Sequence, residues 1–475
     1  MAYNDIINII VHFNGGLVMS DICAVSTPLA EGGISVIRIS GENAAAVAEK
    51  IFEPFTCKKV SDMHGYTCAY GRIFNPQNGK TVDEGVLTVF RAPKSYTGEN
   101  VCEISCHGGI FVTKKVLRLC LDNGCELADK GEFTKRAFLN GKLSLTQAEA
   151  VMDTISAQGE YALNSANLTR EGKLFKNISA LSQRLVQILG ELAAWVDYPE
   201  EDLPEVEEEN LRESLENSIK VLDKILSDYD SGMILKSGIE TCIAGKPNVG
   251  KSTLMNMLLG FDRSIVTDIA GTTRDVIEET ARLGELTLKL SDTAGIHETD
   301  DKVEKMGVEL ARKKLENAML VMAVFDMSMP LDEEDIELLD YVRSLSKKLI
   351  IVLNKSDLDS MIKPDELKKY SKNIVTISAK NDIGTDEIKT AVEGLFSVGS
   401  YDPDSTIFAN ERQKACTEKA RKNLLLALDS LNMGETLDAV TVMIDYAANS
   451  LLELTGEKAT EAVVDEVFSK FCVGK

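Results

Sequence analysis

No run of apolar residues in this sequence is long enough to cross a bilayer, which excludes a membrane-spanning helix. Residues 1–18 contain no Lys or Arg, so they lack the charged start of a secretory signal. Histidine is scarce, with four residues, and the ten cysteines show no paired metal-ligand spacing. We therefore expect a cytoplasmic protein whose cysteines are mostly buried thiols in a reducing compartment.

Basic residues are also scarce relative to acidic ones. Lys and Arg number 52 against 75 Asp and Glu, which gives a formal net charge of −23. This balance disfavours a general electrostatic grip on nucleic acid, because most of the surface would repel phosphate groups. Any RNA contact must therefore be local, or a partner must supply it.

A chain of 475 residues is too long for one hydrophobic core, and its patterns change along its length. Short apolar runs between turns predict a sheet-rich α+β region with helices at 44–51 and near 112–121. Apolar residues three and four apart then predict packed helices on both sides of a segment of alternating strands and helices. That segment predicts a parallel sheet covered on both faces and inserted into one discontinuous helical domain.

We therefore predict a multidomain α/β protein. Residues 1–18 are expected to be a non-native or disordered extension, with translation starting at Met19. The acidic stretch 197–204 contains two prolines and must interrupt the helices; its carboxylates form a solvated loop or, alternatively, a metal site. The predicted boundaries are 19–140 for the N-terminal domain, 141–237 and 399–475 for the helical domain, and 238–398 for the insert.

The stretch Gly245–Thr253, GKPNVGKST, has the glycines, lysine and hydroxyl of a phosphate-binding loop. It follows a strand-like run and opens a helix-compatible segment, which is the context that this motif requires. Lys251 can reach the β- and γ-phosphate oxygens, and the Ser252 hydroxyl can hold Mg²⁺ at the helix N-terminus. The alternative is a glycine turn before an ordinary helix.

Further signatures follow in the order that a GTPase requires. Asp292–Gly295, DTAG, follows a predicted strand, and Thr272 or Thr273 can close on Mg²⁺ when the γ-phosphate is present. In Asn354–Asp357, NKSD, the Asp can accept hydrogen bonds from guanine N1–H and the exocyclic amine, which adenine does not offer, so an ATPase is excluded. The predicted nucleotide-binding residues are Asn248, Val249, Gly250, Lys251, Ser252, Thr253, Thr267, Asp268, Ile269, Ala270, Gly271, Thr272, Thr273, Asp292, Thr293, Ala294, Gly295, Asn354, Lys355, Asp357, Ser378, Ala379 and Lys380.

The motifs do not directly identify the residue that orients the attacking water, because Ile296 follows DTAG where a glutamine usually has this role. Glu304, in the expected mobile second switch, is the nearest carboxylate for this role, and the alternative is a surface helix residue. Arg274 is a candidate arginine finger. A monovalent cation beside the phosphates is another source of positive charge.

These motifs occur together with STPLAEGGISVIRISG and SYTGENVCEISCHGG near the N-terminus and FCVGK at the C-terminus. With them, residues 19–475 closely resemble the MnmE (TrmE) family of tRNA-modifying GTPases. The resemblance implies a Ras-like inserted G domain and a homodimer built through the N-terminal domain, which is similar to folate-dependent one-carbon enzymes.

The resemblance places folate-binding residues at Arg38, Glu103, Lys142 and Lys475. A carboxylate suits the donors of the pterin ring, while Lys and Arg suit the glutamate of folate. Without the resemblance, Arg38 and Lys142 are interpreted as surface charges. Cys472 is a candidate nucleophile or proton-handling group, and a buried structural thiol is the alternative.

The resemblance also implies a K⁺ ion against the phosphates that lets two G domains dimerise. The matching K⁺ ligands are Asn248, Thr267, Ile269 and Thr272, and the matching Mg²⁺ ligands are Ser252 and Thr273. Glu304 matches the residue that orients water through a second water. Oxygen ligands suit these hard cations.

The family's reaction adds a carboxymethylaminomethyl or aminomethyl group at C5 of the wobble uridine of certain tRNAs. It uses a tetrahydrofolate derivative, of which 5-formyltetrahydrofolate is an analogue, and an FAD-containing MnmG partner in a heterotetramer or larger complex. A regulatory or ribosome-assembly GTPase is the alternative. The CVGK ending and the sheet-rich N-terminal domain argue against it, since a pure switch needs neither.

Overall fold

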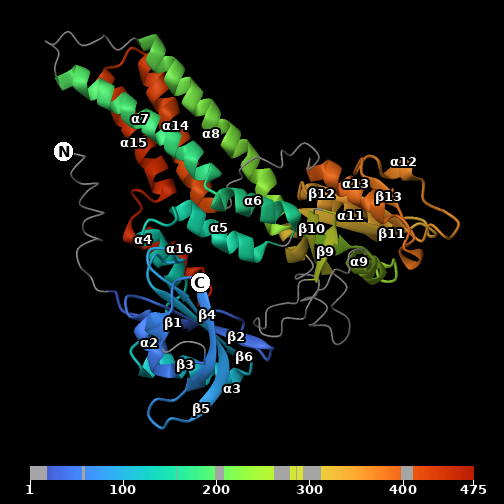
Figure 1. Ribbon diagram of the computed structural model, residues 1–475. Helices are drawn as coiled ribbons and strands as arrows, with labels where there is room; N and C mark the ends of the chain where they lie inside the picture. The colour runs from blue at the N-terminus through green and yellow to red at the C-terminus, as the bar shows by residue number, and fades with distance from the viewer. Residues whose placement is uncertain are drawn as a thin grey trace. The chain divides into compact units, whose positions relative to one another are not determined.

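The computed structural model describes residues 19–55, 59–157, 159–197, 208–260, 279–284, 286–292, 312–396 and 410–475. Contacts divide the chain into two compact units. Figure 1 shows the chain coloured by residue number. The first unit comprises Met1–Met152, Arg170–Glu208 and Asp429–Lys475, and the second comprises Asp153–Thr169 and Glu209–Leu428. The extension 1–18 and residues 198–204 of the acidic stretch lie outside the described residues, and the domain boundaries stay predictions.

The first unit contains a seven-stranded sheet in the order β3-β4-β5-β6-β2-β1-β7. Its neighbouring strands are antiparallel, except that β1 and β7 are parallel. The strands are β1 (Ile22–Val25), β2 (Ile34–Ser40), β3 (Phe52–Pro54), β4 (Thr67–Phe74), β5 (Thr81–Phe90), β6 (Val101–His107) and β7 (Glu126–Leu127).

The two predicted helices are present as α2 (Ala44–Ile51) and α3 (Ile110–Asp122). They cover one face of this sheet, and a short 3₁₀ turn, η1 (Val60–Asp62), packs against α2. Ile37 and Ile39 of β2 are fully buried in the core that these helices close. Because side chains alternate along a strand, Arg38 between them lies on the opposite face, paired in register with Glu103 of β6. Two of the predicted folate-binding residues are therefore brought together by sheet register.

The helical region is discontinuous in sequence, as predicted. In the first unit, α7 lies alongside α15 (Figure 1), and Leu145 of α5 packs with Phe468 of α16. In the second unit, the Tyr229 hydroxyl of α8 donates to Glu411 of α14 at 2.9 Å. Each of these contacts joins a helix that precedes the inserted sheet to one that follows it. The helices are α4 (Glu132–Leu139), α5 (Leu145–Ser156), α6 (Glu160–Arg170), α7 (Lys173–Asp197), α8 (Glu208–Ser237), α14 (Glu411–Asn432), α15 (Leu437–Thr455) and α16 (Glu461–Ser469).

The second unit contains a six-stranded sheet in the order β13-β12-β11-β8-β10-β9. Its central strand β11 is buried on both faces: Met322 and Val324 join one apolar cluster, and Ala323 and Phe325 join the other. Helices α9 and α13 contribute to the first cluster, and α11 and α12 to the second, so the sheet is covered on both faces as predicted. The elements are β8 (Ile239–Ala244), α9 (Lys251–Gly260), β9 (Glu279–Leu283), β10 (Leu286–Asp292), β11 (Leu320–Asp326), α11 (Glu333–Ser344), β12 (Lys348–Asn354), α12 (Pro364–Leu367), β13 (Ile374–Thr376), η2 (Ala379–Asn381) and α13 (Thr385–Phe396).

One prediction about this sheet is wrong, because the sheet is mixed. Strand β9 pairs antiparallel with β10, whereas the other described pairs are parallel. Only two residues separate β9 from β10, and Gly284 among them has φ +62°. A connection this short can reverse the chain but cannot cross over to a parallel neighbour.

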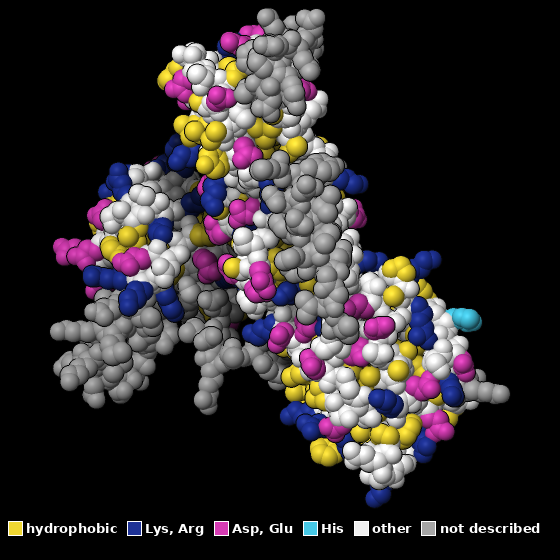
Figure 2. Space-filling model, turned by 90° about the vertical axis from the view of Figure 1, so that its left-hand side faces the viewer, with side chains coloured by type: hydrophobic (Ala, Val, Ile, Leu, Met, Phe, Trp, Pro, Cys, Tyr) yellow, Lys and Arg dark blue, Asp and Glu magenta, His cyan; other side chains and the backbone are white. Residues whose placement is uncertain are grey.

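On the face that Figure 2 presents, the Lys and Arg side chains of the described residues lie interspersed with Asp and Glu. They form no broad basic area there, in agreement with the net charge. Among the described helices, none combines the length and the apolar character needed to span a membrane.

Candidate functional site

The phosphate loop connects β8 to α9, and its backbone takes the positive φ angles of an anion cradle. At Gly245, with φ +150°, an added Cβ would lie 2.4 Å from the Val324 carbonyl oxygen. At Gly250, with φ +100°, it would lie 2.1 Å from Asn354 Nδ2. Both positions therefore require glycine. Asn248 has φ +63°, a left-handed conformation that Asn adopts more readily than most residues.

Lys251 begins α9 and is 6% exposed. Its Nζ donates to the carbonyl oxygens of Gly245 at 2.8 Å and Lys246 at 2.7 Å. An ammonium group held inside the loop in this way can move onto phosphate oxygens when a nucleotide enters. Ser252 follows at the helix N-terminus, where its hydroxyl suits Mg²⁺.

Asn354, at the end of β12, ties the phosphate loop to the base-binding loops. Its Nδ2 donates to the Val249 carbonyl oxygen at 2.8 Å, and its Oδ1 accepts from the Ala379 N–H at 3.0 Å. The Ser378 hydroxyl donates to Asp357 Oδ1 at 2.6 Å, and this bond lowers the pKa of Asp357 from its ordinary value. Asp357 therefore stays ionised and able to accept two N–H bonds from guanine.

The phosphate loop and the base-binding loops line one cavity of about 670 Å³, a size that suits a nucleotide. The predicted nucleotide-binding residues omit Pro247 and Leu358 of its lining, although Pro247 lies within the phosphate loop and Leu358 directly follows NKSD. The predicted residues that line it are Asn248, Gly250, Lys251, Ser252, Thr253, Asn354, Lys355, Asp357 and Lys380.

Other predicted residues of this site lie in segments 261–278 and 293–311, outside the described residues. Asp292 is the last residue of β10 and pairs in register with Ile243 of β8, so its backbone lies at the sheet edge that carries the phosphate loop. In the described part of the chain, no group of three or more His, Cys, Asp or Glu could hold a metal ion. The predicted residues outside the description are Thr267, Asp268, Ile269, Ala270, Gly271, Thr272, Thr273, Arg274, Thr293, Ala294, Gly295 and Glu304.

A second group of predicted residues lies on the open face of the first sheet. Nε and Nη2 of Arg38 each lie 2.8 Å from Glu103 Oε1, and the two side chains are 16% and 26% exposed. The Arg38 guanidinium carbon lies 5.8 Å from the ring centre of Tyr96 and 5.6 Å from that of Phe133. The site thus combines an ordered ion pair with aromatic walls.

The C-terminal tail is bound against this ion pair. Arg38 Nη1 donates to the Gly474 carbonyl oxygen at 3.2 Å, and the Phe133 N–H donates to the Lys475 carbonyl oxygen at 3.2 Å. Gly474 has φ +91°, and an added Cβ would lie 2.3 Å from the Val25 carbonyl oxygen. The close approach therefore explains the glycine of the CVGK ending and places Lys475 beside Arg38.

Three of the four predicted folate-binding residues are close to one another. Burial, and then the charge of Arg38, lower the pKa of Lys475, while Glu103 and Cys472 oppose the shift. Lys142 contacts the neighbouring loop: its Nζ donates to the Pro93 carbonyl oxygen at 3.1 Å, and no described hydrogen bond or ion pair joins it directly to the other three. Cys472 is exposed, so it is not a buried structural thiol; seven of the nine described cysteines are buried, as predicted.

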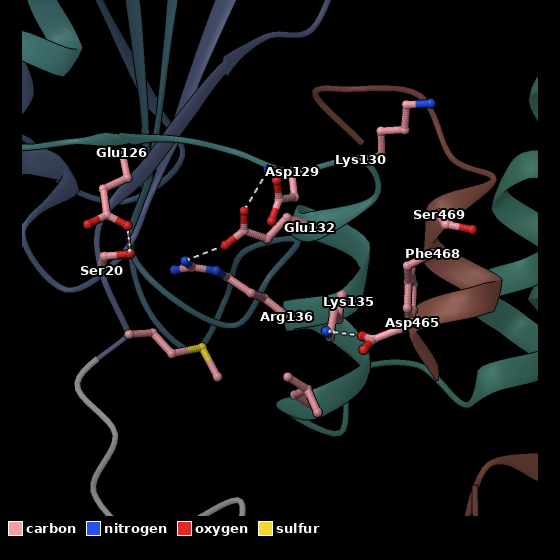
Figure 3. A pocket seen from close by; sticks show the side chains of 12 residues that line it. Ser20, Glu126, Asp129, Lys130, Glu132, Lys135, Arg136, Asp465, Phe468 and Ser469 are labelled. Atoms are coloured by element: carbon pink, nitrogen blue, oxygen red, sulfur yellow. Dashed lines mark hydrogen bonds and ion pairs between the residues drawn. The ribbon is translucent and has the colours of Figure 1, made fainter. Parts of the chain in front are cut away.

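Figure 3 shows a different cavity, of about 890 Å³, which sequence reasoning did not predict. It is lined by residues of α4 and α16 and by residues around β7. Lys135 pairs with Asp465 at 2.6 Å, and Arg136 pairs with Glu132 at 2.8 Å and with Glu99 at 3.3 Å. Lys135 and Arg136 are therefore both paired with carboxylates of the protein in this cavity.

Comparisons with known proteins cover nearly the whole chain. A family model described as the TrmE N-terminus of a GTP-binding protein matches residues 21–142, and one described as the MnmE helical domain matches residues 145–472. A tRNA modification GTPase MnmE from Carboxydothermus hydrogenoformans is 43% identical over 458 residues, which is 96% of this chain and 99% of that protein. Proteins of the same name from Lactobacillus helveticus and Lactobacillus acidophilus are 42% and 41% identical over 456 residues, covering 96% of this chain and 98% of each relative.

Proposed function

Because the chain belongs to the MnmE family of tRNA modification GTPases, we propose that it modifies C5 of the wobble uridine in certain tRNAs. It is a GTP-hydrolysing enzyme that acts in tRNA modification. The group added would be carboxymethylaminomethyl or aminomethyl, with its one-carbon unit drawn from a tetrahydrofolate derivative. GTP hydrolysis would drive the conformational cycle of the complex.

The binding of the tail against the Arg38–Glu103 pair is the observation that most supports a folate site. The Glu103 carboxylate can accept hydrogen bonds from the pterin ring, and Arg38 and Lys475 can bind the carboxylates of the glutamate moiety. The rings of Tyr96 and Phe133 supply apolar walls. Lys142 would complete the site from beside the loop that carries Pro93 and Tyr96. Cys472, exposed in the same tail, stays a candidate for covalent or proton-transfer chemistry.

For GTP hydrolysis, Ser252 and Thr273 would bind Mg²⁺. Asn248 would bind K⁺ together with Thr267, Ile269 and Thr272, and Asn248 lines the nucleotide cavity as this role requires. A K⁺ ion held by these residues would supply positive charge beside the transferred phosphoryl group and would let two G domains dimerise. Glu304 would orient the attacking water, with Arg274 as a candidate for further positive charge.

A homodimer would form through the open face of the first sheet. Tyr70 of β4 and Val86 of β5 pair in register on this face, and they are 50% and 38% exposed. Along the strands, this cross-strand pair lies two residues from the positions in register with Arg38 and Glu103. A second copy placed here would therefore lie close to the folate site. An FAD-containing MnmG-like partner and tRNA would join the dimer in the cytoplasm, and the partner would supply basic surface to this acidic chain, whose net charge is −23.

Removal of Cys472–Lys475 tests the folate site. The truncated protein should bind 5-formyltetrahydrofolate at least about tenfold more weakly in isothermal titration calorimetry, because it loses the Lys475 charge and leaves Arg38 without its carbonyl partner. The variant Lys475→Ala, which keeps the backbone contacts of Gly474, should lose part of this affinity. GTP hydrolysis should be spared in both proteins and serves as the control for folding. Unchanged folate affinity in both would argue against the proposed site.

A further inference from the structure

Lys246, the second residue of the phosphate loop, contacts the start of α11 rather than lining the nucleotide cavity. Its Nζ forms ion pairs with Asp332 and, at 3.1 Å, with Asp335, and Glu334 lies at 4.0 Å. The Lys246 side chain is 22% exposed. No nucleotide-binding motif assigns a role to its side chain.

The anionic partner of Lys246 is ordered by its own helix. Asp332 is the N-cap of α11 and accepts from the N–H groups of Glu334 at 3.1 Å and Asp335 at 3.3 Å. In return, Asp335 accepts from the Asp332 N–H at 3.2 Å, which completes a capping box. The Asp335 side chain is 10% exposed. The two carboxylates are therefore already held in place. When the ion pairs form, the conformational entropy that is lost is mainly that of the lysine side chain.

Two further contacts hold the same end of the phosphate loop. Lys251 Nζ donates to the carbonyl oxygens of Gly245 and Lys246, and Gly245 packs closely against the Val324 carbonyl of β11. The Lys246 ion pairs join this end of the loop to α11.

The same segment also holds the base-binding loop. Asp326, at the end of β11, accepts from Lys355 Nζ at 2.5 Å and from the Ser328 hydroxyl at 2.6 Å. Residues 326–335 thus anchor one lysine from the phosphate loop and one from the base-binding loop.

We propose that Lys246 is a positioning residue for GTP: its ion pairs with Asp332 and Asp335 fix the phosphate loop to the segment that also holds Lys355. This inference rests on GTP binding, which family membership establishes, and not on the modification chemistry. It predicts that loss of Lys246 weakens nucleotide binding more than it slows the bound enzyme.

The test is Lys246→Met in the full chain. We expect its Kd for a fluorescent GDP analogue, and its KM for GTP, to rise about tenfold, which corresponds to 1.4 kcal/mol of lost interaction, while kcat at saturating GTP changes less than about twofold. Lys246→Arg, which keeps the charge, should recover most of the affinity. The effect of Lys246→Met should shrink at high salt, because the wild-type ion pairs are partly exposed and are screened there.

The matched control is Lys289→Met, which breaks the 3.1 Å pair with Glu240 across β10 and β8, with similar exposure but outside the nucleotide cavity. It should leave the nucleotide Kd unchanged. A Lys246→Met protein that melts at a lower temperature but binds nucleotide like the wild type would overturn the inference. So would an equal loss of affinity in Lys289→Met. Wild-type GTP turnover, measured in the same series, reports separately on the family activity.

Discussion

Asp357→Asn is expected to transfer the preference of this enzyme from GTP to XTP, with a loss of GTP affinity on the order of 1,000-fold. The Asp357 carboxylate accepts only; it lines the nucleotide cavity, and the Ser378 hydroxyl donates to its Oδ1 at 2.6 Å. An asparagine amide has only one acceptor oxygen. Its NH₂ group would therefore face a donor of guanine, either N1–H or the exocyclic amine, and the two donors could not pair. Xanthine has a carbonyl group in place of that amine, so the same amide can pair with it.

Competition of GTP and XTP against a fluorescent nucleotide measures this exchange. Asp365→Asn is the matched control, because Asp365 is an exposed carboxylate of the same unit that pairs with Lys368 and lies outside the nucleotide cavity. It should leave both affinities unchanged. If Asp357→Asn still prefers GTP, then Asp357 does not read the base.

Asn248→Gly is expected to abolish the stimulation of GTP turnover by K⁺, with a loss of kcat on the order of 100-fold in K⁺ buffer. Glycine adopts φ +63° without strain, so the loop and its nucleotide affinity should survive while the side-chain oxygen is lost. Asn248→Ala removes the same oxygen but adds backbone strain of about 1 kcal/mol, because Ala has a Cβ in the left-handed region. The difference between the two variants separates cation binding from loop conformation.

Turnover of the wild type should be faster in K⁺ than in Na⁺ at equal ionic strength, and Asn248→Gly should be equally slow in both. Nucleotide affinity, measured in the absence of K⁺, shows whether the loop is intact. Retained K⁺ stimulation in Asn248→Gly would remove Asn248 from the cation site. Equal wild-type rates in the two salts would remove the cation itself.

The types of most helices and strands could be predicted because each depends on the pattern of apolar residues within its own segment. Buried strands such as β11 and β12 are continuous apolar runs, and β2 alternates, so their types and limits could be read from the sequence. Strand β9 was missed, and with it the mixed character of the sheet, although Gly284 marks a turn too short for a crossover. The direction of β9 depends on that connection and not on the residues of the strand.

The nucleotide site was predictable because its residues are consecutive within short loops. The link from Lys246 to Asp335 and the link from Lys355 to Asp326 join loops far apart in the sequence, and charge alone does not single out these partners. The tail shows the same limit. A glycine before the last lysine is visible in the sequence. Only the fold shows that Gly474 packs too closely against the Val25 carbonyl oxygen to carry a Cβ atom, and that its own carbonyl accepts from Arg38. The contact of Lys142 with the Pro93 carbonyl oxygen, in the loop that carries Tyr96, is likewise visible only in the fold.

This chain is a GTP-hydrolysing enzyme of tRNA modification, and we propose that the base it modifies is the wobble uridine. Nucleoside analysis of tRNA from cells that lack the protein tests this most directly. We expect wobble uridines in the affected tRNAs to lose their C5 carboxymethylaminomethyl or aminomethyl group and to regain it when the wild-type gene is restored. Wobble uridines that stay fully modified in its absence would contradict the proposed function.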